Sequence, residues 1–181
     1  MVKLFRPAIT LLKHYAEYHR DQRNIRTHFV GVPMIVLGVL VLLSAPRVWL
    51  GGVGLTPADV IFAMAAAWYL TRGQLGLGAA VTACTALLLM VAQAFSAQAS
   101  FSSWLTWGLG LFVVGWAVQF VGHWYEGRKP AFIDDMVGLL VAPMFVVLEA
   151  LAMLGLFKDL MAQIEQHAGP THLRNLAHPA S

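Results

Sequence analysis

Five long apolar segments constrain the fold of this chain more than any other feature. They cover residues 29–45, 58–70, 75–95, 104–121 and 136–157. The chain is 59% hydrophobic and only 12% charged, whereas a soluble domain carries about 25% charge, so the excess apolar surface must face lipid. A backbone in lipid must satisfy its own hydrogen bonds, and the period-two alternation of a β-barrel is absent. We therefore predict an all-α integral membrane helical bundle of about four to five spans.

The whole chain, residues 1–181, is predicted to form a single membrane domain with three parts. Residues 1–28 form an interfacial helix and a polar corner, residues 29–157 the transmembrane bundle, and residues 158–181 a polar tail. The fifth apolar segment contains Pro143, so it either crosses fully or is re-entrant.

An amphipathic helix is expected over residues 3–20, where apolar and basic side chains fall on different sides. A basic helix of this kind typically lies on an anionic membrane surface. Because no short cleavable apolar region comes first, we predict no signal peptide. The single cysteine, Cys84, excludes an internal disulfide.

The positive charges predict the orientation in the membrane. Six of the twelve lysines and arginines precede the first apolar segment, which places the N-terminus in the cytoplasm. They do not form a stripe on a soluble face, so nucleic acid is not a predicted partner. Four spans then bring the start of the first segment and the end of the fourth to the same membrane face. We expect a bacterial inner membrane.

Three of the seven histidines lie at predicted membrane boundaries beside helix ends. These are His19, His28 and His123. Histidine is costly in such a place unless it is paired or bound to a metal. The topology puts all three on the cytoplasmic face, so one interpretation is a shared metal site, and the other is helix capping with surface hydrogen bonds. The remaining four are expected on the surface: His14, His167, His172 and His178.

Helix geometry sets a condition on the N-terminal pair. His19 and His28 are nine residues apart, and at about 100° per residue they would point to opposite sides of one straight helix. They can share a metal only if the chain breaks between them, and we predict this break near Asp21 to Asn24. Asn24 either caps the following helix or, four residues before His28, orients its imidazole.

Two later segments add polar groups at membrane depth. Gln119, His123 and Glu126 line one face of a continuing helix. Glu126 is a fourth ligand, a carboxylate that holds a ligand histidine, or an ion-pair partner of the basic residues that follow. Glu149, inside an apolar run, is either a base beside a ligand histidine or a hydrogen-bonded packing group. Imidazole and carboxylate ligands with open positions suit iron(II) as well as zinc.

Two blocks of sequence together resemble a known family. The first is Tyr18-His19-x4-Asn24-x3-His28. The second is Gly115-Trp116-x2-Gln119-Phe120-Val121-Gly122-His123, followed by Glu126-x-Arg128-Lys129-Pro130-Ala131. They are similar to the membrane 2-hydroxy fatty acid dioxygenases, which include the fungal α-oxidation enzyme of phytosphingosine degradation and bacterial relatives. The resemblance covers residues 15–157, with one residue fewer between His123 and Glu126 than the fungal pattern.

The resemblance implies an iron(II)-dependent dioxygenase that shortens a 2-hydroxy long-chain fatty acid by one carbon and releases CO2. Its partners are then the fatty acid, O2 and membrane lipid, with the acyl chain among the spans. The implied metal ligands are His19, His28 and His123. The residues expected around them are Asn24, Gln119, Glu126 and Glu149. Three arginines either attract the substrate carboxylate or anchor to anionic lipid: Arg20, Arg23 and Arg26.

Two other functions remain open. The chain could be a non-catalytic membrane protein for lipid binding or assembly, with histidines as interfacial anchors. It could also be another metal-dependent lipid-modifying enzyme, although membrane hydroxylases usually carry several clustered His-x(2–4)-His boxes and this sequence has none.

Overall fold

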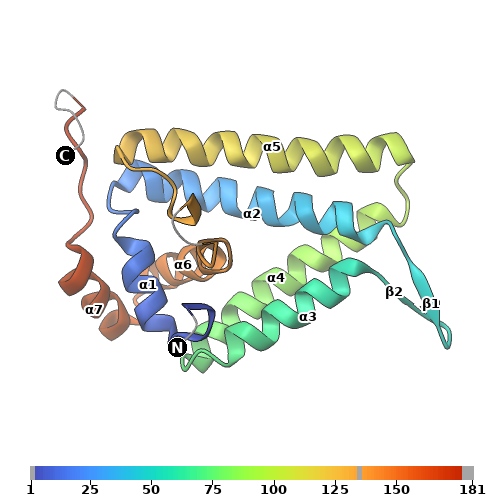
Figure 1. Ribbon diagram of the computed structural model, residues 1–181, viewed down its shortest axis with the longest axis horizontal. Coiled ribbons are helices and arrows are strands. Elements are labelled where there is room, and N and C mark those ends of the chain that lie inside the picture. Colours follow the sequence, from blue (N-terminus) through green and yellow to red (C-terminus); the bar gives the residue numbers. More distant parts are fainter. Residues whose placement is uncertain (1–2, 134–135, 177–181) are drawn as a thin grey trace.

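The computed structural model describes residues 3–133 and 136–176, and its architecture is a helical bundle (Figure 1). The chain order is η1 (Lys3–Phe5), α1 (Ala8–Ala16), α2 (Gln22–Ser44), β1 (Val48–Leu50), β2 (Val53–Leu55), α3 (Pro57–Leu70), α4 (Leu75–Ser96), α5 (Phe101–Glu126), η2 (Ala131–Ile133), α6 (Gly138–Met153) and α7 (Lys158–Ala168). The predicted all-α class is confirmed, and the one two-stranded sheet lies outside the apolar helices.

Within the described residues, three helices are long and apolar enough to cross a membrane: α2, α4 and α5. Helices α6 and α7 pass the same test only together, and they are bent by 117° at the break between them. Helix α3 is apolar but has only 14 residues, fewer than the roughly 20 needed to cross the hydrocarbon core. Many large apolar side chains are exposed on these helices, as lipid contact requires; they include Met64, Leu87, Met90, Val113 and Val114.

Helices α2 and α5 lie side by side along most of their length, with opposite chain directions (Figure 1). Glycines make this close approach feasible. A Cβ atom added to Gly38 would lie 2.7 Å from the backbone nitrogen of Phe112, and one added to Gly115 would lie 3.0 Å from the carbonyl oxygen of Gly31. Small residues at such contacts allow helix backbones to approach in lipid, where packing drives association. The pairing sets the start of α2 beside the end of α5.

The connection between the first two apolar segments is a β-hairpin, although its Gly51-Gly52-Val53-Gly54 run predicts a flexible loop. Strands β1 and β2 pair antiparallel, with Leu50 opposite Val53. The two residues between them, Gly51 and Gly52, have φ of 56° and 87°. A two-residue hairpin turn of this hand needs positive φ at both positions, which glycine adopts without steric cost.

The N-terminal helix is shorter than predicted and is packed inward. Helix α1 covers Ala8–Ala16 rather than residues 3–20. Its apolar side, including Leu12 and Tyr15, is buried in a core shared with α6 and α7 rather than laid on lipid alone. Amphipathicity therefore identified the helix correctly, but its apolar side packs against other helices of the protein.

The C-terminal region is more ordered than a polar tail. Helix α7 buries Leu160 and Ile164 in the same core as α1, and the chain after it runs along the end of the bundle past the start of α2 (Figure 1). Asp134 and Asp135 stand just before the fifth apolar segment, where their charge predicts helix caps. These two residues and His178 lie outside the described residues.

Candidate metal centre

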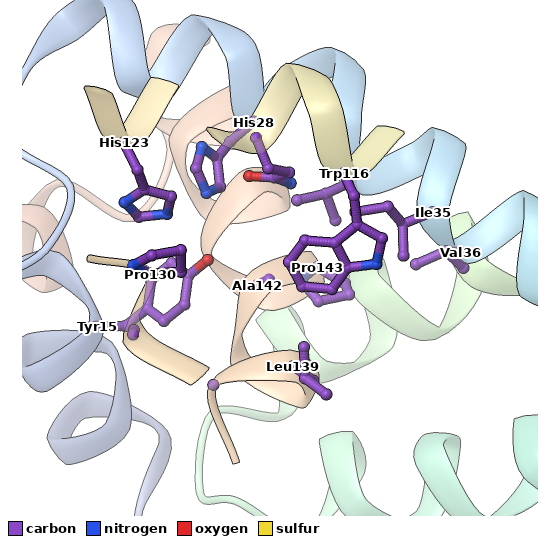
Figure 2. Close-up of a pocket in the computed structure, with 14 residues that line it drawn as sticks. Tyr15, His28, Ile35, Val36, Trp116, His123, Pro130, Leu139, Ala142 and Pro143 are labelled. Atoms are coloured by element: carbon purple, nitrogen blue, oxygen red, sulfur yellow. The ribbon is translucent and has the colours of Figure 1, made fainter. Parts of the chain in front are cut away.

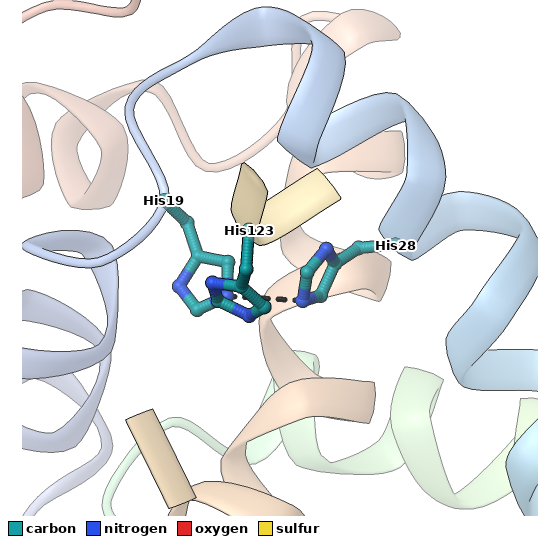
Figure 3. A group of neighbouring side chains, drawn as sticks. All are labelled: His19, His28 and His123. Carbon is teal, nitrogen blue, oxygen red and sulfur yellow. Dashed lines mark hydrogen bonds between the residues drawn. The ribbon is translucent and has the colours of Figure 1, made fainter. Parts of the chain in front are cut away.

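Three histidines from three different parts of the chain converge at one end of the α2–α5 pair (Figure 3). His19 lies in the connection between α1 and α2, His28 in the second turn of α2, and His123 near the end of α5. One ligand nitrogen of each lies within 4.8 Å of the others, and all three side chains are buried. In the described residues this is the one group of histidine, cysteine and carboxylate side chains with such spacing.

The predicted break in the helix is present and explains the convergence. Helix α1 ends at Ala16 and α2 begins at Gln22, so His19 is not held to the helical phase of His28. The N-cap is Asp21, whose side chain accepts a hydrogen bond from the backbone N–H of Arg23 at 2.8 Å. The prediction that Asn24 caps this helix is wrong, because Asn24 is already in its first turn.

Two of the imidazoles are fixed by the same local arrangement. Nδ1–H of His19 donates to the carbonyl oxygen of Tyr15 at 2.7 Å, and Nδ1–H of His28 donates to the carbonyl oxygen of Asn24 at 2.9 Å. Each carbonyl lies four residues before its histidine. Asn24 therefore orients His28 as expected, but through its main chain and not through its amide.

These hydrogen bonds decide which nitrogens are free for a ligand. A carbonyl oxygen only accepts, so each Nδ1 carries the proton and each Nε2 carries a lone pair. The two Nε2 atoms lie 3.0 Å apart. Neither can donate to the other unless a ring becomes protonated, and burial, together with His28 and His123, holds the pKa of His19 well below its usual value.

A cation beside these lone pairs would remove their repulsion. Two imidazole nitrogens that each lie about 2.0–2.1 Å from one metal ion can be at most about 4.2 Å apart, and the 3.0 Å separation satisfies this limit. The third ring, of His123, has a buried Nδ1 without a hydrogen-bond partner among the described residues. The donor set and its protonation thus fit a metal ion.

The carboxylate of Glu126 holds the corner that carries His19. It accepts hydrogen bonds from the backbone N–H of Arg20 at 2.9 Å, the backbone N–H of Asp21 at 2.8 Å and Nδ2 of Asn24 at 3.0 Å. Glu126 itself is only 9% exposed. The described contacts of Glu126 are therefore with donors of the corner, and it is not in the histidine group.

Arg20 and Glu149 form a buried ion pair beside this corner. Nη2 of Arg20 lies 3.6 Å from Oε1 of Glu149, and Nε of Arg20 donates to the carbonyl oxygens of Ala16 and His19. Burial lowers the pKa of Arg20, and the carboxylates of Glu149 and Glu126 partly offset this. Arg20 is only 4% exposed, so it does not anchor to lipid, and the partner of Glu149 is this arginine and not a histidine.

The other two arginines lie farther from the histidines. Arg23 forms two hydrogen bonds with the carboxylate of Asp21, at 3.0 and 2.7 Å, and its guanidinium lies 4.6 Å from the ring centre of Tyr125. Arg26 is exposed. Neither lines the cavity that adjoins His28 and His123, and none of the described residues lining that cavity is cationic.

Sequence reasoning missed the part of the C-terminal region that covers the corner. The backbone N–H of His172 donates to the carbonyl oxygen of Arg20, and that of Gln22 donates to the carbonyl oxygen of His172, each at 2.9 Å. The backbone N–H of Arg174 donates to Asp21 at 2.8 Å. Burial alone would raise the pKa of Asp21, but hydrogen bonds from Arg23 and from the Arg174 backbone lower it to about 2. These contacts use backbone atoms of the C-terminal segment, so the residue types in the sequence do not predict them.

Comparison with known proteins places this geometry in a family. A family model described as "2-hydroxy-palmitic acid dioxygenase Mpo1-like" matches residues 5–154. The 2-hydroxy-palmitic acid dioxygenase MPO1 of Saccharomyces cerevisiae is 32% identical over 158 residues, which are 85% of each chain. No solved structure is significantly similar to the chain. The match includes all three converging histidines and the helices that carry them, and this membrane protein belongs to the Mpo1-like family of 2-hydroxy-palmitic acid dioxygenases.

Proposed function

We propose that this protein is an iron(II)-dependent dioxygenase that removes one carbon from 2-hydroxy long-chain fatty acids. The observation that carries the proposal is the group of three buried imidazoles in a member of this family, two of which turn the lone pairs of their Nε2 atoms toward each other. Three nitrogen ligands leave further positions open for substrate and O2. Zinc has no redox chemistry, so iron(II) is the metal that suits an oxidation.

The proposed reaction balances without an external reductant. A 2-hydroxy acid, R–CH(OH)–COOH, and O2 give R–COOH, CO2 and water. The bond between C1 and C2 breaks, and the substrate supplies all four electrons that O2 takes up. When bound, the metal ion supplies a positive charge for the carboxylate and hydroxyl of the substrate and a redox centre for O2.

The residues of the chain have distinct roles in this proposal. His19, His28 and His123 hold the metal ion. The carbonyl groups of Tyr15 and Asn24 keep the protons on the distal nitrogens of two of these rings, as partners behind a metal ligand generally do. Glu126, Asp21 and the Arg20–Glu149 pair do not touch the metal position; they hold the corner in place.

We further propose that the site lies on the cytoplasmic side of a bacterial inner membrane. Basic residues concentrate at the end of the bundle that carries the histidines, as the positive-inside rule requires of a cytoplasmic face. The exposed Arg26 lies at this end of α2, while Trp49 in the hairpin marks the opposite end (Figure 1). Labelling of single cysteines introduced at Arg26 and Trp49, in a variant with Cys84→Ser, tests this orientation in intact cells with a reagent that does not cross the membrane. Labelling at Arg26 instead of Trp49 would reverse it.

The decisive experiment measures metal content and reaction stoichiometry in purified protein. With iron(II) bound, 2-hydroxyhexadecanoic acid should yield pentadecanoic acid and CO2 in a 1:1 ratio, with one O2 consumed. Replacement of His19, His28 and His123 together by alanine should abolish iron binding and turnover. The matched control is His14→Ala, because His14 is exposed on α1. Full activity in the triple variant, or a wild-type protein that turns over no 2-hydroxy acid, would refute the proposal.

A further inference from the structure

A narrow cavity begins at the histidines and extends into the apolar part of the bundle. It lies between α2, α5 and the first turns of α6, and its atoms leave about 450 Å³ empty, part of which is open to the surroundings. Figure 2 shows His28 and His123 at one end of this cavity and Ile35 and Val36 at the other.

The spacing of the lining residues shows that each helix contributes one continuous face. His28, Val32, Ile35 and Val36 lie at positions i, i+4, i+7 and i+8 of α2, which fall on one side of a helix. Trp116, Gln119 and His123 repeat this pattern at i, i+3 and i+7 of α5. The third wall comes from α6 and the segment before it, with Pro130, Ala131, Leu139 and Ala142 among its members.

The walls change character along the cavity. Next to the histidines they include the amide of Gln119, whereas farther along they are aliphatic or aromatic. Gln119 is only 5% exposed, and its Oε1 has no hydrogen-bond partner among the described residues. A buried acceptor without a donor is destabilising, so its presence in a cavity wall indicates a ligand that donates a hydrogen bond.

We propose that this cavity binds the acyl chain of a 2-hydroxy long-chain fatty acid, with Gln119 as the acceptor for the 2-hydroxyl group. The inference rests on the proposed function for the identity of the polar head, and it adds the place and direction of the chain. A polar head at the histidines and an apolar chain toward Val36 match the two halves of the cavity. Gln119 acts here as a positioning residue that selects for the hydroxyl.

The length of the cavity also matches such a ligand. From His28 to Val36 is eight residues of helix, which is about 12 Å at 1.5 Å per residue. One leaflet of a bilayer, which an acyl chain spans, is about 15 Å thick. The cavity is therefore a few ångströms shorter than a long acyl chain, so the part of the chain next to the head lies between the helices and its methyl end reaches Val36 and Trp116 or extends just past them.

A crosslinking experiment tests the location without relying on turnover. Metal-free, full-length protein in nanodiscs is incubated with 2-hydroxyhexadecanoic acid that carries a diazirine near its methyl end, and the labelled residues are identified by mass spectrometry. We expect labels at Val36, Trp116 or Leu139 that unlabelled 2-hydroxyhexadecanoic acid removes. Labels only on outward-facing residues such as Val30, which is 53% exposed on α2, would overturn the proposal.

Two substitutions test the direction of the chain and the role of the amide. Val36→Trp should fill the far end and shift the preference, measured as kcat/KM, at least tenfold toward 2-hydroxydecanoic acid over 2-hydroxyhexadecanoic acid. The matched control, Val30→Trp, places the same side chain on the outer side of α2 and should leave the preference unchanged. An unchanged profile in Val36→Trp, with wild-type metal content, would contradict the proposed direction.

Gln119→Leu should reduce the advantage of 2-hydroxyhexadecanoic acid over hexadecanoic acid about tenfold in the crosslinking competition. This is the fold-change expected for one lost hydrogen bond. Retention of the full advantage would refute the role of Gln119.

The failures of the two proposals are distinguishable. Competed labels in the cavity, in a wild-type protein without dioxygenase activity, would remove the proposed reaction and keep the acyl-chain site. Dioxygenase activity with labels only on outward-facing residues would remove the acyl-chain site and keep the proposed reaction.

Discussion

Replacement of Glu126 by glutamine should loosen the corner that carries His19 without removing a metal ligand. The carboxylate accepts hydrogen bonds from three donors, the backbone N–H groups of Arg20 and Asp21 and the amide of Asn24. Glutamine keeps one acceptor oxygen and turns an NH2 group toward a donor. At least one hydrogen bond to a charged acceptor is then lost, and such bonds contribute about 1.5–3 kcal/mol each.

The loss should be visible in both stability and metal affinity. We expect the free energy of unfolding to fall by about 2–4 kcal/mol, since the charge-assisted bonds that remain also weaken. Residues that orient metal ligands typically contribute 10–100-fold to affinity, so the dissociation constant for iron(II) or a substitute such as cobalt(II) should rise within that range.

The assay is competitive metal titration against a chromophoric chelator, combined with thermal unfolding in the same detergent. Glu17→Gln is the matched control, because it makes the same chemical change at the protein surface. The carboxylate of Glu17 forms its ion pairs with the surface residues His14 and His167. Wild-type metal affinity and unfolding in Glu126→Gln would show that the corner does not depend on this carboxylate, and would refute the reasoning.

Three further predictions concern the metal, the helix pair and the C-terminal region. Iron(II) at 100 times its dissociation constant should stabilise the protein by about 2.7 kcal/mol over the chelated form, measured by thermal unfolding; no shift, or the same shift in the triple histidine variant, would contradict a site at these residues. Gly115→Ala should lower the free energy of unfolding by about 1–3 kcal/mol, because the added Cβ would lie 2.7 Å from Ile35. Gly110→Ala, whose Cβ would meet open space, should unfold as wild type. Equal effects of the two substitutions would count against close packing of α2 and α5. Removal of residues 169–181 should weaken metal binding about tenfold, because the contacts to Arg20 and Asp21 are lost. Leu173→Ala, which changes an exposed side chain on the same segment, should leave metal affinity unchanged. Unchanged affinity after truncation would show that these contacts are dispensable.

The sequence could predict the elements whose signal is local. Apolar segments located the membrane helices, and the phase argument for His19 and His28 correctly required a break before the first span. The predicted break near Asp21 to Asn24 includes the observed cap, which is Asp21 and not Asn24. Both residue types favour that position, so residue type alone does not choose between them. The prediction that His28 and His123 meet followed from four alternating apolar helices. Helices α2, α3, α4 and α5 do return the chain to the same end of the bundle, although α3 is too short to cross by itself.

The remaining parts of the site depend on contacts that composition does not encode. Arg20 looked like a surface cation because it stands among Arg23 and Arg26, but its burial follows from Glu149, which is more than a hundred residues away. The contacts of His172 with the corner use its backbone, so the side chain carried no signal. Distance in sequence and backbone recognition are the two physical reasons for these omissions.

The contacts around the histidines orient the metal ligands before a metal ion binds. Two of the three rings are held by groups that do not need a metal ion: the carbonyl of Tyr15 at the end of α1 holds His19, and the carbonyl of Asn24 in α2 holds His28. Glu126 at the end of α5 holds the corner that carries His19. His19 and His28 are therefore oriented before metal binds, which lowers the cost of ordering these two ligands at that moment. The same arrangement leaves two Nε2 lone pairs 3.0 Å apart, a repulsion that binding of a cation relieves.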